Sequence, residues 1–123
     1  MKFEESPAGL LIVSYAVADD LRTDLQAPVV ARLEKKQGKV VVVFDVADAV
    51  RSVPMDVPNF WLGVTGRREL QIAGMGIVTR SIAVRVAARG FALANAARGV
   101  PTIVQTFTDL ESASSWGTAM LAG

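Results

Sequence analysis

The chain has 123 residues, a length that suits one domain with one hydrophobic core. Hydrophobic residues make up 51% of it and charged residues 20%, so its composition is too apolar for an intrinsically disordered chain. It contains no cysteine and no histidine, which excludes disulfides, thiolate and imidazole catalysis, and metal sites built on those ligands.

The charge balance argues against nucleic acid as a partner. Lys plus Arg number 13 against 12 for Asp plus Glu, far from the basic excess of a nucleic-acid binder. The longest uncharged stretch, Ser6 to Ala18, is shorter than the roughly 18 to 20 apolar residues that span a bilayer, so we expect no transmembrane segment. The first five residues lack the apolar core of a secretory signal, and we expect a cytoplasmic location.

The first elements predicted are a hairpin and a helix. The apolar run from Leu10 to Val17 predicts a strand buried on both faces, and residues 2 to 5 can pair with it as a short charged edge strand. The Ser-Pro-Ala-Gly sequence between them is a turn. Asp24 to Lys36 then predicts a helix entered through Thr23 or Asp24, with Pro28 close to its start.

The clearest element is the valine tract. Lys39 to Val46 holds four successive valines and Phe44, the pattern of a buried parallel strand. A loop follows, and a helix is expected from Asp56 through Trp61 to a break around Gly66.

The second half continues the alternation of strand and helix. Leu70 to Val78 predicts a strand whose two glycines, Gly74 and Gly76, indicate close packing by a helix. Ser81 to Arg98 predicts the longest helix, closed by Gly99 in the left-handed conformation.

The chain is expected to end with an edge strand and a short helix. Val100 to Phe107 predicts the strand, with Pro101 favouring a sheet edge. Thr108 to Glu111 reads as a capping box for a helix that returns Ala113, Trp116 and Met120 to the core. The predicted fold is a single α/β domain over residues 1–123, with a four- to five-stranded, mostly parallel sheet, an N-terminal hairpin and flanking helices.

Carboxylates surround the end of the valine strand. Asp45, Asp48 and Asp56 could hold Mg²⁺ there, but Asp48 and Asp56 serve equally well as loop and cap residues. The spacing of Asp45 and Asp48 is not the Asp-x-Asp of phosphotransferases, and the glycines do not form a nucleotide-binding motif. We therefore predict no metal, no cofactor and no catalytic residue.

The helix over residues 81–98 is apolar around most of its circumference. It carries seven alanines together with Val84, Val86, Phe91 and Leu93. Part of this surface needs a neighbour, which can be a second copy, another protein, a hydrophobic ligand or the rest of the domain. Arg85 and Arg89 lie one turn apart on this helix and could grip a carboxylate or phosphate, or simply face solvent.

The chain resembles the STAS superfamily, and within it the small proteins similar to anti-sigma-factor antagonists. The resemblance lies in the N-terminal hairpin, the valine strand ending Phe44-Asp45-Val46, and the stretch from Phe107 through Asp109, Glu111 and Ala113 to Trp116. It implies a non-enzymatic regulatory, interaction or ligand-sensing module. The Asp-Ser-Ser-Gly or Asp-Ser-Thr-Gly segment that is phosphorylated in such antagonists is missing, since residues 51 to 56 read Arg-Ser-Val-Pro-Met-Asp, and Ser52 inherits no such role.

Two functions follow as hypotheses. The first is docking to a regulatory protein or to a second copy, giving a homodimer or larger homo-oligomer, through the helices over residues 81–98 and 56–66. The alternative is a site for a small apolar or amphipathic, lipid-like ligand, with arginine at its mouth for an acidic head group. The candidate ligand or partner residues are Phe60, Trp61, Met75, Arg85, Arg89 and Phe91.

Overall fold

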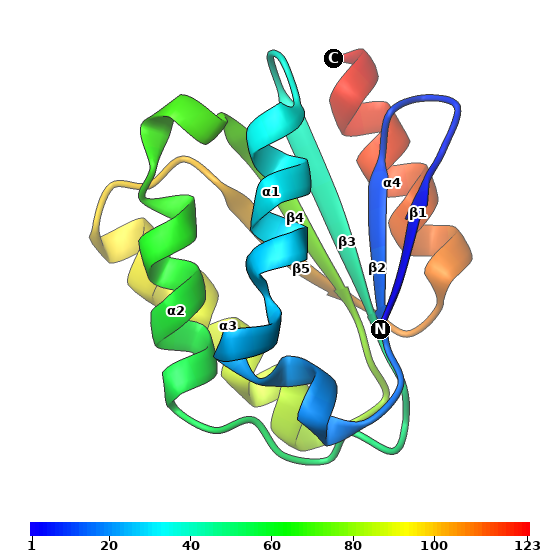
Figure 1. Ribbon diagram of the computed structural model, residues 1–123, viewed down its shortest axis with the longest axis vertical. Coiled ribbons are helices and arrows are strands. Elements are labelled where there is room, and N and C mark those ends of the chain that lie inside the picture. Colours follow the sequence, from blue (N-terminus) through cyan, green and yellow to red (C-terminus); the bar gives the residue numbers. More distant parts are fainter.

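Five strands form one sheet with helices on both faces in the computed structural model, which describes residues 1–123 (Figure 1). The elements in chain order are β1 Lys2–Glu5, β2 Leu11–Tyr15, the 3₁₀ turns η1 Ala18–Leu21 and η2 Thr23–Leu25, α1 Ala27–Lys35, β3 Val40–Val46, α2 Asp56–Thr65, the 3₁₀ turn η3 Arg68–Leu70, β4 Ile72–Val78, α3 Ile82–Ala97, β5 Ile103–Phe107 and α4 Leu110–Ala122. The predicted α/β class is confirmed.

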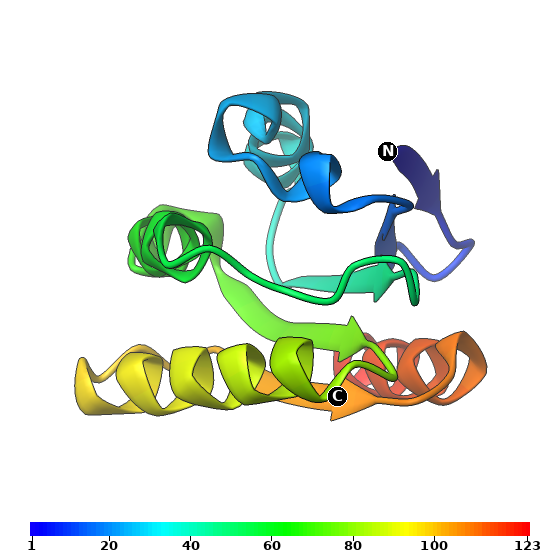
Figure 2. The ribbon, with the colours of Figure 1, turned by 90° about the horizontal axis from the view of Figure 1, so that it is seen from below.

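The strand order explains how the helices are divided between the two faces. The strands lie in the order β1-β2-β3-β4-β5, with β1 antiparallel to β2 and every later pair parallel. From β2 to β5, each new parallel strand is added beside the previous one in the same direction across the sheet. Because the connections between parallel strands are right-handed, α1, α2 and α3 all lie on one face of the sheet. The last helix, α4, lies across the sheet from α1 and α2 (Figure 2).

β3 contributes side chains to two separate cores because successive residues of a strand point to opposite faces. Val40, Val42 and Phe44 belong to the larger core beneath α1, α2 and α3, whereas Val41 and Val43 belong to the smaller core beneath α4. All four valines of the tract are at most 2% exposed. The prediction of a central buried strand is therefore confirmed.

Glycines bring α4 close to the sheet. A Cβ on Gly76 would lie 3.1 Å from the Trp116 ring, and one on Gly74 would lie 3.0 Å from the same ring. On the helix itself, a Cβ on Gly117 would meet Leu10 at 2.7 Å. The structure thus confirms that the two strand glycines serve close helix packing.

The first helix begins later than predicted, at Ala27 instead of Thr23 or Asp24. Pro28 occupies its first turn, where its missing N–H costs nothing, and the residues before it form two 3₁₀ turns instead. The buried Gln26 amide donates to the carbonyl oxygens of Asp20 and Arg22, which holds these turns in place.

The last helix is capped one residue later than the predicted capping box. The N-cap is Asp109, whose carboxylate accepts from the Ser112 N–H at 2.7 Å, and not Thr108. The last strand is confirmed at the sheet edge, but it begins only at Ile103, after Pro101. Thr102 instead donates its hydroxyl hydrogen to the Ile72 carbonyl oxygen at 2.6 Å.

Candidate functional site

A cavity of about 80 Å³ lies between α2, α3 and the carboxyl-terminal half of the sheet. Of its 14 lining residues, 13 are hydrophobic, so it offers apolar contact almost everywhere. The lining residues are Tyr15, Leu21, Phe44, Val46, Val53, Val57, Pro58, Trp61, Met75, Ile77, Val84, Ala87, Ala88 and Phe91.

Aromatic rings form a continuous row along this cavity. Tyr15 stacks on Phe44 with ring centroids 5.6 Å apart, and Phe44 meets Trp61 edge to face at 5.0 Å. Phe60 extends the row by packing edge to face on Trp61 at 5.2 Å, although it does not line the cavity. Such pairs stabilise a core beyond their area burial, so the row stabilises this wall of the cavity.

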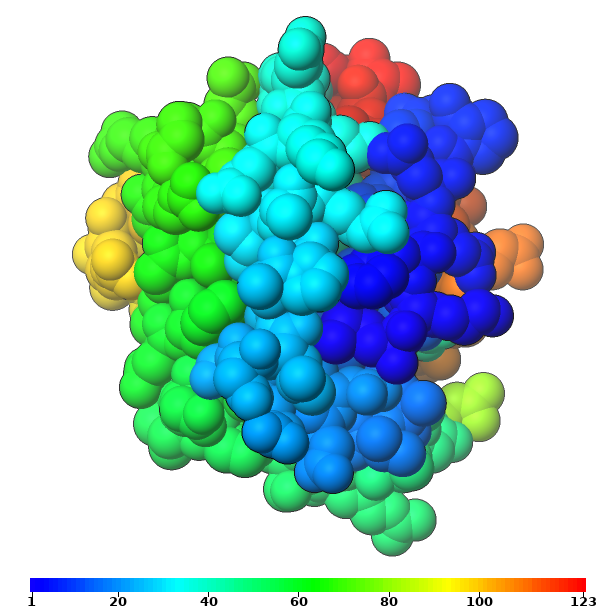
Figure 3. Space-filling model, viewed as in Figure 1, coloured from blue at the N-terminus to red at the C-terminus, as the bar shows by residue number.

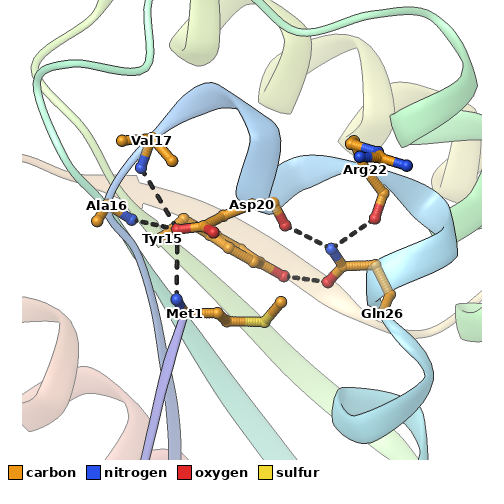
Figure 4. A network of polar contacts seen from close by, with 7 residues as sticks. All are labelled: Met1, Tyr15, Ala16, Val17, Asp20, Arg22 and Gln26. Atoms are coloured by element: carbon orange, nitrogen blue, oxygen red, sulfur yellow. Dashed lines mark hydrogen bonds and ion pairs between the residues drawn. The ribbon is translucent and has the colours of Figure 1, made fainter.

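The Tyr15 hydroxyl is held by a polar network beside the cavity (Figure 4). It donates to the Gln26 side-chain oxygen at 2.6 Å, and the Gln26 amide nitrogen donates in turn to two backbone carbonyl oxygens. Burial, with a smaller contribution from the negative charge of Asp20, raises the pKa of Tyr15, so the phenol stays neutral. This hydroxyl therefore works as a structural donor.

Asp20 secures the other side of the same network. Its carboxylate accepts from the Ala16 N–H at 2.8 Å and lies 3.5 Å from the Met1 ammonium nitrogen. Burial alone would raise the pKa of Asp20, but these partners and the Val17 N–H outweigh it and lower the pKa below its ordinary value. The carboxylate thus fixes the turn that carries Leu21 to the cavity wall.

The structure brings together three of the six predicted residues. Trp61, Met75 and Phe91 all line the cavity, from α2, β4 and α3 respectively. Arg85 and Arg89 do not lie at its mouth: both are exposed on α3 and absent from the lining. They occupy a different side of the helix from Val84, Ala88 and Phe91, which face the core.

The outer face of α3 is apolar and uncovered. Ile82, Val86 and Leu93 are 76%, 65% and 67% exposed, although each is a large aliphatic side chain. The opposite side of the helix is buried against the sheet and α2, through Val84, Ala88, Phe91 and Asn95. One side of α3 is therefore already buried within the chain, and a second apolar side stays exposed to solvent.

Positive charge accompanies this face. Between Gln71 and Thr108 the chain has four arginines and no acidic residue. Arg85 and Arg89 on α3 take part in none of the five ion pairs of the structure. Arg85 and Arg89 are thus not paired with any acidic side chain of this chain.

α2 does not expose the apolar contact surface that we expected from the sequence. Val57, Trp61 and Val64 of this helix are buried in the core, and Phe60 is half-buried. No large hydrophobic side chain within α2 is exposed, although Met55, directly before it, is 76% exposed. The aromatic mass of α2 therefore builds the cavity wall instead of an outer surface.

The carboxylates at the end of β3 do not converge. Asp45 is half-buried, and its desolvation together with the charge of Glu4 raises its pKa, while Asp48 and Asp56 are exposed. No group of three or more His, Cys, Asp or Glu side chains is placed to hold a metal ion. None of the helices has the length and apolar character required to cross a membrane.

Sequence reasoning missed two aromatic residues of the cavity, Tyr15 and Phe44. Both point to the same face near the carboxyl ends of adjacent parallel strands, with Val13 paired to Phe44 and Tyr15 to Val46. The aromatic residues near the ends of two neighbouring strands were the sequence signal that could have predicted this part of the cavity. Nothing in the pattern of residues 16 to 26 marks Gln26 as the buried partner of Tyr15.

Comparison with known proteins identifies no relative: no protein-family model, no curated protein and no solved structure matches the chain.

Proposed function

We propose that this protein is a non-enzymatic interaction module that docks through the outer face of α3. The observation that carries the proposal is the exposure of Ile82, Val86 and Leu93 on one side of a helix whose other side is buried. A face of large aliphatic residues left in water is unfavourable for a free chain, and such a patch is typical of a contact surface.

The resemblance to the STAS superfamily supports the same proposal. The order of elements, from the N-terminal hairpin to the final helix with Trp116, suits a small regulatory module of that kind. In this proposal the partner is a regulatory protein or a second copy, and the cytoplasm is where they meet. Because the Asp-Ser-Ser-Gly or Asp-Ser-Thr-Gly segment is absent, the phosphorylation switch of the antagonists is not carried over to this chain.

The test compares one face of α3 with a neutral position elsewhere. The double variant Val86→Lys/Leu93→Lys places charges on the outer face, and Asn59→Lys places one on the exposed side of α2 as a matched control. We expect the double variant to lose the partner proteins that the unchanged protein captures from cells that make this chain, or to lose the dimer that light scattering measures. The control variant should keep them. Identical capture and identical oligomeric state for all three proteins would contradict the proposal.

A second candidate function, binding of a small apolar ligand, is favoured by the cavity beside Trp61, Met75 and Phe91. At about 80 Å³ it has roughly half the volume of the engineered cavity of about 150 Å³ that takes up benzene, so it suits the end of an aliphatic chain. The probe is n-hexanol, followed through the Met75 methyl resonance. A saturable shift that disappears in the cavity-filling variant Ala88→Leu supports binding, and an unchanged resonance contradicts it.

A further inference from the structure

Five exposed residues of α3 form a seam with the spacing of paired helices. The seam residues are Ala83, Val86, Gly90, Leu93 and Ala97, all exposed. Their intervals are three, four, three and four residues, the alternation that keeps one line of side chains facing a second helix. At 1.5 Å per residue the seam runs for about 21 Å along α3. Its shape therefore suits another helix better than an extended strand.

Gly90 lies at the middle of the seam, and packing within the chain does not explain a glycine there. It is in the interior of α3, where glycine lowers helix stability relative to alanine. No heavy atom lies within 4 Å of the position that its Cβ would occupy, so packing inside the protein does not require a glycine there. A second helix that crosses α3 at this point can bring its backbone close to Gly90, because no side chain keeps the two helices apart.

The charges beside the seam define the chemistry of that second helix. Arg85 and Arg89 lie one turn apart, and Arg89 directly precedes Gly90 in the sequence. Both are exposed, neither is in an ion pair, and no acidic residue occurs between Gln71 and Thr108. A partner with carboxylates along the edge of its apolar stripe would pair with this flank.

A second copy fits the charges less well. Because the seam is centred on Gly90, a two-fold pairing of antiparallel α3 helices would place Arg89 of one copy beside Arg89 of the other. Like charges at that distance repel, and no acidic side chain of α3 can relieve them. The same flank attracts a helix that carries Glu or Asp.

We propose that the α3 seam binds an acidic amphipathic helix of a different protein, an inference that rests on the proposed function. The helix lies along the seam, with its closest approach at Gly90 and its carboxylates next to Arg85 and Arg89. A contact along one helix over about 21 Å buries less area than a standard interface of about 800 Å² per partner, so we expect a weak complex with a dissociation constant of about micromolar order.

Two designed peptides test the charge requirement. Both are 21-residue amphipathic helices with the same Leu and Ala stripe; one carries Glu along the stripe and the other carries Lys. Titrated into the ¹⁵N-labelled protein, the Glu peptide should shift amide resonances of α3 with micromolar affinity, and the Lys peptide should bind at least tenfold more weakly. The double variant Arg85→Gln/Arg89→Gln should remove most of this difference between the peptides.

Two glycine variants test the close approach. Gly90→Leu places a bulky side chain in the seam and should weaken the Glu peptide at least tenfold. Gly63→Leu is the matched control, because Gly63 is also an exposed helical glycine with no atom within 4 Å of its Cβ position, but it lies on α2. It should leave the affinity unchanged.

The outcomes separate this inference from the proposed function. Equal affinity for the two peptides, or equal effects of the two glycine variants, overturns the acidic helix. A dimer of the pure protein that Gly90→Leu dissociates would also overturn the acidic helix, although it would still agree with docking through α3. Binding to vesicles with 30% anionic lipid that Leu93→Lys abolishes would overturn the acidic helix as well. Docking through α3 itself fails if the charged double variant keeps all of its captured partners and its oligomeric state.

Discussion

α3 and α4 each carry a glycine near the middle, and the two glycines lie in opposite surroundings. Gly117 of α4 faces the sheet, where a Cβ would lie 2.7 Å from the fully buried Leu10 and 3.3 Å from Val41. Gly90 of α3 faces solvent with nothing near it. The small residue of α4 is explained by packing within the chain, and that of α3 is not. This difference supports the proposal that α3 contacts a partner outside the chain.

The largest expected effect concerns the sheet on which both helices rest. Val42→Asp places an unpaired charge at a position with 0% exposure, which costs several kcal/mol against a total stability of about 5 to 15 kcal/mol. We expect no folded protein, so neither helix has a surface to pack on. A cooperative thermal transition for this variant, followed by circular dichroism, would contradict the position of the strand.

Replacing the two glycines should shift stability in opposite directions. Gly117→Leu forces side-chain atoms against Leu10 and should lower the free energy of unfolding by about 1 to 3 kcal/mol or more. Gly90→Leu removes a poor helix former from an open position and should raise it by up to about 1 kcal/mol. Urea unfolding measures both; equal shifts of the same sign would remove the contrast between the helices.

Two carboxylates should give opposite pH dependences. The pKa of Asp20 is lowered in the folded protein, so its stabilising effect is complete above the unfolded pKa of about 3.9 and is lost as the pH falls below it. The pKa of Asp45 is raised, mainly by burial, so its ionised form destabilises the folded state at neutral pH.

Urea unfolding at pH 7 and pH 3 can check both signs. We expect Asp20→Asn to lower stability at pH 7 and to weaken the loss on acidification. Asp45→Asn should raise stability at pH 7 and have little effect at pH 3. The reverse order at pH 7 would show that the environments of the two carboxylates are wrongly assigned.

The smallest expected effect on stability concerns the outer face of α3. Leu93 is 67% exposed, so Leu93→Lys should change the free energy of unfolding by less than about 0.5 kcal/mol. The same change should nonetheless abolish docking. A large loss of stability in thermal unfolding would mean that this side chain serves the core of its own chain.

The fold was largely predictable because its signals are local. The valine tract, the glycines that end helices and the proline at the edge strand each indicate their structure within a few residues. The predicted start of α1 was wrong because residues 18 to 25 form two 3₁₀ turns, and the predicted cap of α4 was wrong because Asp109, next to Thr108, is an equally good cap residue. The start of α1 depends in addition on contacts of the buried Gln26, whose side chain bonds to Tyr15 and to the 3₁₀ turns.

The site was only partly predictable because α3 has apolar residues around most of its circumference. A helix with one apolar stripe shows which side faces the core, but α3 offers two, so the sequence did not separate Phe91, which is buried, from Arg85 and Arg89, which are exposed. α1, by contrast, has a single apolar stripe, in which Val29 and Leu33 are buried and Val30 is half-buried. In the space-filling view α1 lies over the centre of one face of the molecule, and α3 reaches only its edge (Figure 3).

The most direct test of docking through α3 is site-specific photo-crosslinking in the cells that make the protein. A photoreactive amino acid at position 86 lies on the outer face of α3, and one at position 59 lies on the exposed side of α2. Docking through α3 predicts a discrete covalent adduct from position 86 and none from position 59. No adduct at position 86, or the same adducts at both positions, would contradict it.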